Sequence, residues 1–237
     1  MSKHAEKGNA AAERPRFFGR RKGKALRRNA LGLIEDLLPR LSLAIPQPGE
    51  ILEPGLLFPG AVRSVWLEVG FGGGEHLAEL AETNPDLGLI GCEVFKNGIA
   101  SLLGHVQTRH LGNVRIFPED ARLLLPALPD GALGRAFVLF PDPWPKTRHA
   151  YRRFISPENL DALARVLEDG GELRVASDDP VYVAWAAHQL DAHPDFEKVL
   201  ATTDRAGVPA DWPATRYEQK CITGRAPTFF LYRRRAR

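Results

Sequence analysis

The segment that decides the fold is VWLEVGFGGG, residues 65–74. Its first five residues are apolar except for Glu68, which predicts a short buried strand. The glycines that follow allow a ligand to approach the backbone closely. The spacing of Leu77, Leu80 and Ala81 then predicts a helix directly after them. A strand, a glycine loop and a helix in this order predict a ligand-binding unit of an α/β fold.

The same alternation of apolar runs and amphipathic segments continues along the chain. Further strands are predicted at residues 87–93, 114–117, 136–140 and 173–176, with helices between them. After these, residues 196–200 and 228–232 are strand-like with no good helix between them, so they are expected to pair as an antiparallel edge. This order predicts a Rossmann-like fold with a mostly parallel, seven-stranded sheet and an antiparallel C-terminal edge.

Two helix starts carry clear capping signals. Ser156 followed by Pro157 is typical of an N-cap and a first helical position, and this helix is expected to end at Gly170-Gly171. Asp179 before Pro180 is expected to cap the next helix in the same way.

Composition excludes several classes of protein. The chain has 237 residues, 44% hydrophobic and 26% charged, as expected for one globular domain with extensions. No apolar run approaches the roughly 18 residues that span a bilayer, and the N-terminus lacks the apolar region of a secretory signal. Two distant cysteines, Cys92 and Cys221, exclude a disulfide scaffold or a thiolate zinc site. We therefore expect a cytoplasmic protein.

Charge divides the chain into parts. Residues 1–29 carry a net charge of +8 and the rest −5, with a second basic cluster at Arg233, Arg234, Arg235 and Arg237. Basic ends on an acidic body indicate either a polyanionic partner or solubilising tails. We expect residues 1–23 to form a basic, disordered arm that takes part in polyanion binding only. Residues 24–60 are expected to form a helix stopping at Pro39 and a Pro-rich connector, and residues 61–237 the main domain.

Acidic residues follow the strands of the predicted parallel sheet. Ligands of such sheets bind outside the carboxyl ends of the strands, where buried positions do not normally collect carboxylates. These acids are Glu68, Glu93, Asp120, Asp142 and Asp178. Their positions predict a ligand site at this edge.

The glycine loop favours one kind of ligand. The dinucleotide fingerprint G-x-G-x-x-G fails, because the sixth position is Glu75 or Leu77. The spacing is instead E-x-G-x-G-x-G, from Glu68 to Gly74, which resembles the first motif of S-adenosylmethionine-dependent methyltransferases. Their cofactor has no phosphates and carries an ammonium group that Glu68 can help neutralise. Glu93 is then placed to accept the ribose hydroxyls, and Asp120 to meet the adenine amino group.

The most specific stretch is FPDPWPKTRHAYRR, residues 140–153. Its prolines fix the backbone around Asp142, and Trp144 offers a stacking face for a base. Cations suited to phosphates follow at Lys146, Arg148, Arg152 and Arg153. The alternative is a proline-stiffened surface loop with solvated charge.

Here the chain closely resembles the bacterial tRNA (guanine-N7-)-methyltransferases, the TrmB family. The family pattern P-D-P-W-x-K-x-R-H-x-x-R-R is matched from Pro141 to Arg153, and the resemblance includes GCEV at 91–94 and TRYE at 215–218. It covers roughly residues 24–233 and implies a class I methyltransferase fold, with residues 61–237 as the methyltransferase domain. The implied cofactor is S-adenosylmethionine and the implied partner is tRNA.

The resemblance also implies a set of site residues. Asp142 matches the presumed catalytic residue. The cofactor-binding residues are expected to be Glu68, Gly70, Gly72, Gly74, Glu93, Asp120 and Asp142. The substrate-binding residues are expected to be Lys146, Arg148, His149, Arg152, Arg153, Asp178, Thr215, Arg216, Tyr217 and Glu218.

The implied reaction is methylation of guanine N7 at position 46 of the tRNA variable loop. N7 already has an in-plane lone pair, so the enzyme must align the reactants and stabilise the developing positive charge. We expect Asp142 to act by orientation and electrostatics rather than as a base.

No cluster has metal-ligand spacing, so no metal is expected. Two alternatives are an exocyclic-amine methyltransferase and a non-catalytic RNA-binding protein on this fold. Monomer and homodimer both remain open.

Overall fold

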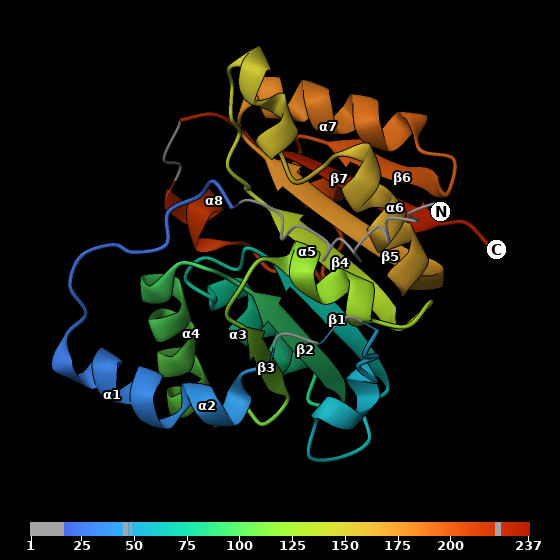
Figure 1. The fold of residues 1–237 in the computed structure, drawn as a ribbon. Coiled ribbons are helices and arrows are strands. Elements are labelled where there is room, and N and C mark those ends of the chain that lie inside the picture. The colour runs from blue at the N-terminus through green and yellow to red at the C-terminus, as the bar shows by residue number, and fades with distance from the viewer. Residues whose placement is uncertain (1–16, 45–46, 48, 221–223) are drawn as a thin grey trace, which may run out of the picture.

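The computed structural model describes residues 17–44, 47, 49–220 and 224–237. Its described strands form one sheet in the order β3-β2-β1-β4-β5-β7-β6, with helices on both faces (Figure 1). The strands are β1 (Ser64–Val69), β2 (Leu87–Cys92), β3 (Val114–Phe117), β4 (Leu133–Leu139), β5 (Leu167–Ser177), β6 (Phe196–Thr202) and β7 (Thr228–Arg234). The α-helices are α1 (Arg28–Asp36), α2 (Leu38–Leu41), α3 (Glu75–Thr83), α4 (Lys96–Arg109), α5 (Ala121–Leu124), α6 (Pro157–Val166), α7 (Pro180–Ala192) and α8 (Arg216–Lys220).

The strand pairing confirms the predicted fold class. Strands β1 to β5 pair in parallel, whereas β7 is antiparallel to both β5 and β6. Successive side chains in a strand point to opposite faces, so β1 contributes to two hydrophobic layers. Val65 and Leu67 pack with α5, α6 and α7, and Trp66 packs with α3 and α4. Burial on both faces explains the nearly continuous apolar runs of the central strands.

Three local expectations about helices were wrong. The first helix ends at Asp36, and Pro39 lies in the first turn of α2, where its missing N–H is not needed. Helix α6 ends at Val166 rather than at the glycines, because Leu167 is extended and pairs with Leu133 in the sheet. Helix α8 lies between β6 and β7, where we expected none.

The N-terminal residues pack beside the glycine-loop half of the sheet. Helix α1 contacts α4, and Leu43 donates its backbone N–H to Ile116 of β3 at 2.7 Å. Of the predicted arm, residues 1–16 lie outside the described part of the chain. Residues 17–23 are irregular and run alongside the start of α4. Within the described residues, no helix is long and apolar enough to cross a membrane.

Candidate cofactor and substrate site

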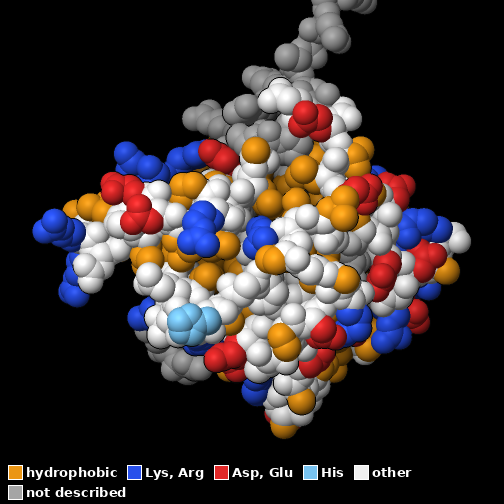
Figure 2. Space-filling model, turned by 90° about the horizontal axis from the view of Figure 1, so that it is seen from below, with side chains coloured by type: hydrophobic (Ala, Val, Ile, Leu, Met, Phe, Trp, Pro, Cys, Tyr) orange, Lys and Arg blue, Asp and Glu red, His pale blue; other side chains and the backbone are white. Residues whose placement is uncertain are grey.

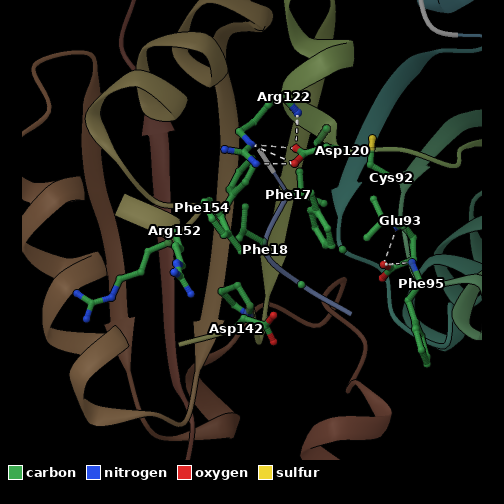
Figure 3. Close-up of a pocket in the computed structure, with 18 of the residues that line it drawn as sticks. Phe17, Phe18, Cys92, Glu93, Phe95, Asp120, Arg122, Asp142, Arg152 and Phe154 are labelled. Atoms are coloured by element: carbon green, nitrogen blue, oxygen red, sulfur yellow. Dashed lines mark hydrogen bonds and ion pairs between the residues drawn. The ribbon is translucent and has the colours of Figure 1, made fainter. Parts of the chain in front are cut away.

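The strand ends enclose a cavity of about 430 Å³ (Figure 3). Its walls include Gly70 and Gly72 of the glycine loop and three of the predicted acids, Glu93, Asp120 and Asp142. Gly70 and Gly72 have φ of 72° and 57°, a backbone conformation that favours glycine. A Cβ atom at either position would meet no atom within 4 Å. The loop therefore curves with an open backbone surface, as close approach of a ligand requires.

Glu93 holds the glycine loop and the next loop together. Its carboxylate accepts backbone N–H bonds from Gly72 at 2.9 Å, from Val94 at 2.8 Å and from Phe95 at 2.9 Å. Burial raises the pKa of Glu93, an effect that these N–H bonds oppose and that the negative charge of Asp142 strengthens. Glu93 and Asp142 both line the cavity, so both contribute negative charge to it. A carboxylate fixed in this way has free lone pairs for hydroxyl groups.

Asp120 is more engaged than we expected. It accepts the backbone N–H of Arg122 at 3.0 Å as the N-cap of α5, and it pairs with the Arg122 guanidinium at 2.6 Å. Asp120 also lines the cavity, but both of its carboxylate oxygens already accept hydrogen bonds from the backbone and guanidinium of Arg122. Its first role, however, is to start α5.

Asp142 lies in a strained segment. Phe140 and Trp144, on either side of Pro141-Asp142-Pro143, have φ of 49° and 42°. Bulky residues rarely adopt positive φ, and such strain is concentrated at functional sites. Asp142 itself is exposed and lines the cavity. The loop thus presents one carboxylate at the mouth of the cavity.

Arg153 holds this strained loop in place. Its guanidinium donates to the carbonyls of Pro143 at 3.1 Å and Trp144 at 3.0 Å, and it stacks over Trp185 at 4.8 Å. The residue is only 5% exposed. We expected Arg153 among the RNA-contacting cations, but the structure uses it to position the loop, because its donors face backbone oxygens rather than solvent.

The outer side of the loop carries aromatic and cationic side chains together. The Arg152 guanidinium lies over the rings of Trp144 at 4.7 Å and Tyr151 at 5.4 Å. His149 contacts Trp144 edge-on at 5.9 Å, and desolvation together with nearby cations lowers its pKa. Exposed Lys146 and Arg148 complete this surface. We call these residues, 144–152, the basic loop.

Other basic regions differ from this loop. Two of the four C-terminal arginines, buried Arg234 and exposed Arg237, pair with Asp169. On the face seen in Figure 2, basic and acidic side chains are interspersed, with hydrophobic side chains between them. Basic charge beside the cavity comes instead from the basic loop and from Arg20, which lines the cavity.

Glu68 lies on a different side of the glycine loop from Glu93. It is 3% exposed and forms a 2.8 Å hydrogen bond with His76 Nδ1. It lines a second cavity of about 310 Å³, which shares Gly70 and Gly72 with the first. Gly74 lines neither cavity; it has φ of 80° at the start of α3, and a Cβ there would lie 2.6 Å from Leu102. Its absent side chain permits helix packing.

The TRYE segment forms a capping box. Thr215 Oγ1 accepts the backbone N–H of Glu218 at 3.1 Å, and the Glu218 carboxylate accepts the backbone N–H of Thr215 at 2.7 Å. Tyr217 stacks on Phe140 at 4.8 Å, and Arg216 pairs with Glu75 at 2.9 Å. The predicted substrate motif therefore starts α8 and supports the strained end of β4.

Asp178 and Tyr217 line a third cavity of about 320 Å³, together with Glu218. Burial raises the pKa of Tyr217, and the negative charges of Asp178 and Asp179 add to this effect. Asp179 caps α7 as predicted, accepting the N–H of Tyr182 at 2.9 Å. Among the residues that the structure describes, no group of three His, Cys, Asp or Glu side chains is arranged to hold a metal ion.

Sequence reasoning missed three features of the site. The T-x-x-E spacing of Thr215 and Glu218 is itself the signature of a capping box, so this feature was available in the sequence. The inward direction of Arg153 and the contact between Glu68 and His76 had no local signal.

The fold and the site define a class of protein. A parallel sheet with an antiparallel β7, a glycine loop after β1 and acids at the strand ends are the features of a class I methyltransferase. Among solved structures, the 16S rRNA methyltransferase KamB is similar, with a TM-score of 0.55 and 19% identity over 73% of this chain and 89% of that chain. At this identity the similarity concerns the fold.

Sequence comparison then identifies the family. Residues 62–231 match a family model described as a putative methyltransferase. The tRNA (guanine-N(7)-)-methyltransferase of Paramagnetospirillum magneticum is 85% identical over the full length of both chains. That of Rhodospirillum rubrum is 52% identical over 95% of this chain and 90% of its own. The chain belongs to the TrmB family of methyltransferases.

The methyl donor of this enzyme class is S-adenosylmethionine, and the cavity fits such a molecule. Its volume lies in the range of about 300–1,000 Å³ that is usual for small-molecule pockets. The open backbone of Gly70 and Gly72 suits a group without phosphates, and Glu93 offers a carboxylate to hydroxyl groups. Glu68 lies in the adjoining cavity, where a carboxylate suits an ammonium group.

Proposed function

We propose that this protein transfers a methyl group from S-adenosylmethionine to N7 of a guanosine in tRNA, at position 46 of the variable loop. One observation carries the proposal: the strained segment around Asp142 joins the cavity of the strand ends to the basic loop. A cavity suited to a cofactor and a surface suited to RNA therefore meet at the Asp142 carboxylate. The names of the relatives support tRNA as the substrate.

The proposed site residues bind different parts of the methyl donor. Glu93, with Gly70, Gly72 and Asp120, binds the nucleoside part of the donor, and Glu68 attracts its amino group. S-adenosylmethionine supplies an electrophilic methyl group when it is bound. The protein has to align that group with guanine N7, and such alignment can contribute roughly 7–11 kcal/mol to lowering a barrier.

Asp142 carries the catalytic role in this proposal. Guanine N7 attacks through an existing lone pair, so no proton has to be removed first. The base gains positive charge as the bond forms, and a fixed carboxylate stabilises that charge without reorganising. Asp142 is suited to this because prolines on both sides and the Arg153 hydrogen bonds restrict its backbone.

The basic loop is proposed to hold the RNA. Trp144 provides an aromatic face for stacking, and Arg152, Arg148 and Lys146 provide cations for phosphates. We place the reaction in the cytoplasm and assign the chemistry to residues 61–237.

The test is to incubate the full chain with labelled S-adenosylmethionine and unmodified tRNA, then to identify the labelled nucleoside. We expect 7-methylguanosine at one position, and its loss when guanosine 46 is replaced by adenosine. Label on an exocyclic amine would favour the alternative methyltransferase. Cofactor and tRNA binding without any label transfer would favour a non-catalytic RNA-binding protein.

A further inference from the structure

A segment from the N-terminal end of the chain forms part of the cofactor cavity. Phe17, Phe18, Gly19 and Arg20 line the same cavity as Glu93, Asp120 and Asp142. In Figure 3 the rings of Phe17 and Phe18 lie between Asp120 and Asp142. We call residues 17–24 the strap. The cavity of about 430 Å³ exists with the strap in place, so the strap is a wall of the cavity and does not fill it.

One end of the strap is attached beside the cofactor loop. The backbone N–H of Lys96 donates to the carbonyl of Arg21 at 3.1 Å. The Asn97 side chain accepts the N–H of Gly23 at 2.9 Å and donates to the carbonyl of Lys24 at 2.8 Å. These bonds join the strap to the first turn of α4, which directly follows Glu93 and two of its three N–H donors, Val94 and Phe95.

The other end of the strap contacts the basic loop. The Phe18 ring meets Tyr151 edge-on at 5.4 Å and Trp144 at 6.4 Å, and the Arg152 guanidinium lies 4.5 Å from its centroid. A Cβ atom on Gly19 would lie 3.4 Å from Asp142 Oδ2. The strap therefore spans the distance between the residues proposed for the cofactor and those proposed for RNA.

We propose that the strap completes the cofactor site, with Phe18 as a positioning residue that couples the cofactor cavity to the basic loop. An apolar ring at the mouth of the cavity gives the cofactor an aromatic contact surface and excludes water from the site. The Arg152 guanidinium packs against the Phe18 ring. A change in the position of Arg152 on RNA binding is therefore transmitted to the cavity through the strap. The inference rests on the proposed function for the identity of both ligands. It revises our expectation that the N-terminal arm does not affect the cofactor.

Calorimetry with S-adenosylhomocysteine, without RNA, tests the strap. The full chain is compared with a chain lacking residues 1–16, which keeps the strap, and with Phe18→Ala and Phe18→Tyr. We expect the truncated chain and Phe18→Tyr to bind like the full chain. Phe18→Ala should bind about five- to tenfold more weakly, the equivalent of an aromatic contact. Thermal unfolding of Phe18→Ala should be unchanged, because its ring is only partly buried.

A second measurement tests the coupling. Unmodified tRNA should strengthen S-adenosylhomocysteine binding to the full chain and to Phe18→Tyr, but not to Phe18→Ala. Equal dissociation constants for Phe18→Ala and the full chain, or an equal enhancement of their S-adenosylhomocysteine binding by tRNA, would overturn the role of the strap. Neither outcome would overturn the proposed cofactor site. Failure of the full chain itself to bind S-adenosylhomocysteine would instead overturn the proposed cofactor site.

Discussion

Replacing Glu93 by alanine should damage both the fold and cofactor binding. The carboxylate accepts three backbone N–H bonds, from Gly72, Val94 and Phe95, and alanine leaves all three donors without this partner. A buried unsatisfied donor costs about 1–3 kcal/mol, and water from the adjoining cavity favours the lower end of that range. Alanine also removes a buried carboxylate, and the desolvation free energy that is no longer lost offsets part of this cost. The expected net loss is about 2–3 kcal/mol of unfolding free energy.

This loss is large enough to measure. For a chain of this size, each kcal/mol lowers the Tm by about 2–4 °C, so the Tm should fall by about 4–12 °C. Glu93→Gln is the matched control, because its amide oxygen can still accept the N–H groups of Val94 and Phe95. It should lose about 1 kcal/mol, since only the bond to Gly72 is lost.

Cofactor binding is measured separately, by calorimetry with S-adenosylhomocysteine below the Tm of the variant. Loss of a charged acceptor for hydroxyl groups should weaken binding by about 1.5–3 kcal/mol, or roughly 10- to 150-fold. A Tm of Glu93→Ala equal to that of the unchanged protein would refute the role of Glu93 in holding the glycine loop. Unchanged affinity would place the cofactor away from the end of β2.

Four further substitutions separate chemistry, RNA binding and loop structure. Asp142→Asn should lower single-turnover methyl transfer by about 10²- to 10³-fold with an unchanged Tm, because the residue is exposed; an unchanged rate would contradict its role. Arg153→Met should lower stability by about 2–3 kcal/mol in chemical denaturation, whereas a change only in the salt dependence of tRNA binding would indicate a phosphate contact. Arg148→Ala should reduce the salt slope of tRNA binding by about 1 and leave the Tm unchanged; an identical slope would remove Arg148 from the interface. Thr215→Val should cost about 1 kcal/mol and speed amide exchange in α8, and unchanged exchange would argue against the capping box.

Local sequence patterns were sufficient to predict the sheet and its functional edge. The apolar runs that became β1 to β4 and the glycines after Glu68 gave the parallel order, because a short buried run followed by a helix has few other arrangements. The acids after these runs could be assigned to one edge for the same reason. Family resemblance added the reaction, which periodicity alone does not specify.

Helix ends and the roles of individual side chains were harder to predict from the sequence. Gly170-Gly171 is an ordinary helix-stop signal, yet pairing of Leu167 with Leu133 ended α6 earlier, since a buried strand contact outweighs a local preference. Arg153 belongs to a run of cations, and nothing in the run distinguishes it from Arg152. Its inward direction depends on Trp185, which lies on α7.

The sequence by itself determined that acids and glycines meet at the carboxyl ends of a parallel sheet, because the alternation of apolar runs and helical segments is a local property and the acids follow those runs directly. Only the tertiary structure decided which of those acids share a cavity. It placed Glu68 against His76, left Glu93 and Asp142 facing one cavity, and set Phe18 between that cavity and the basic loop. Such contacts join residues far apart in the chain, and their geometry depends on packing that no single segment encodes.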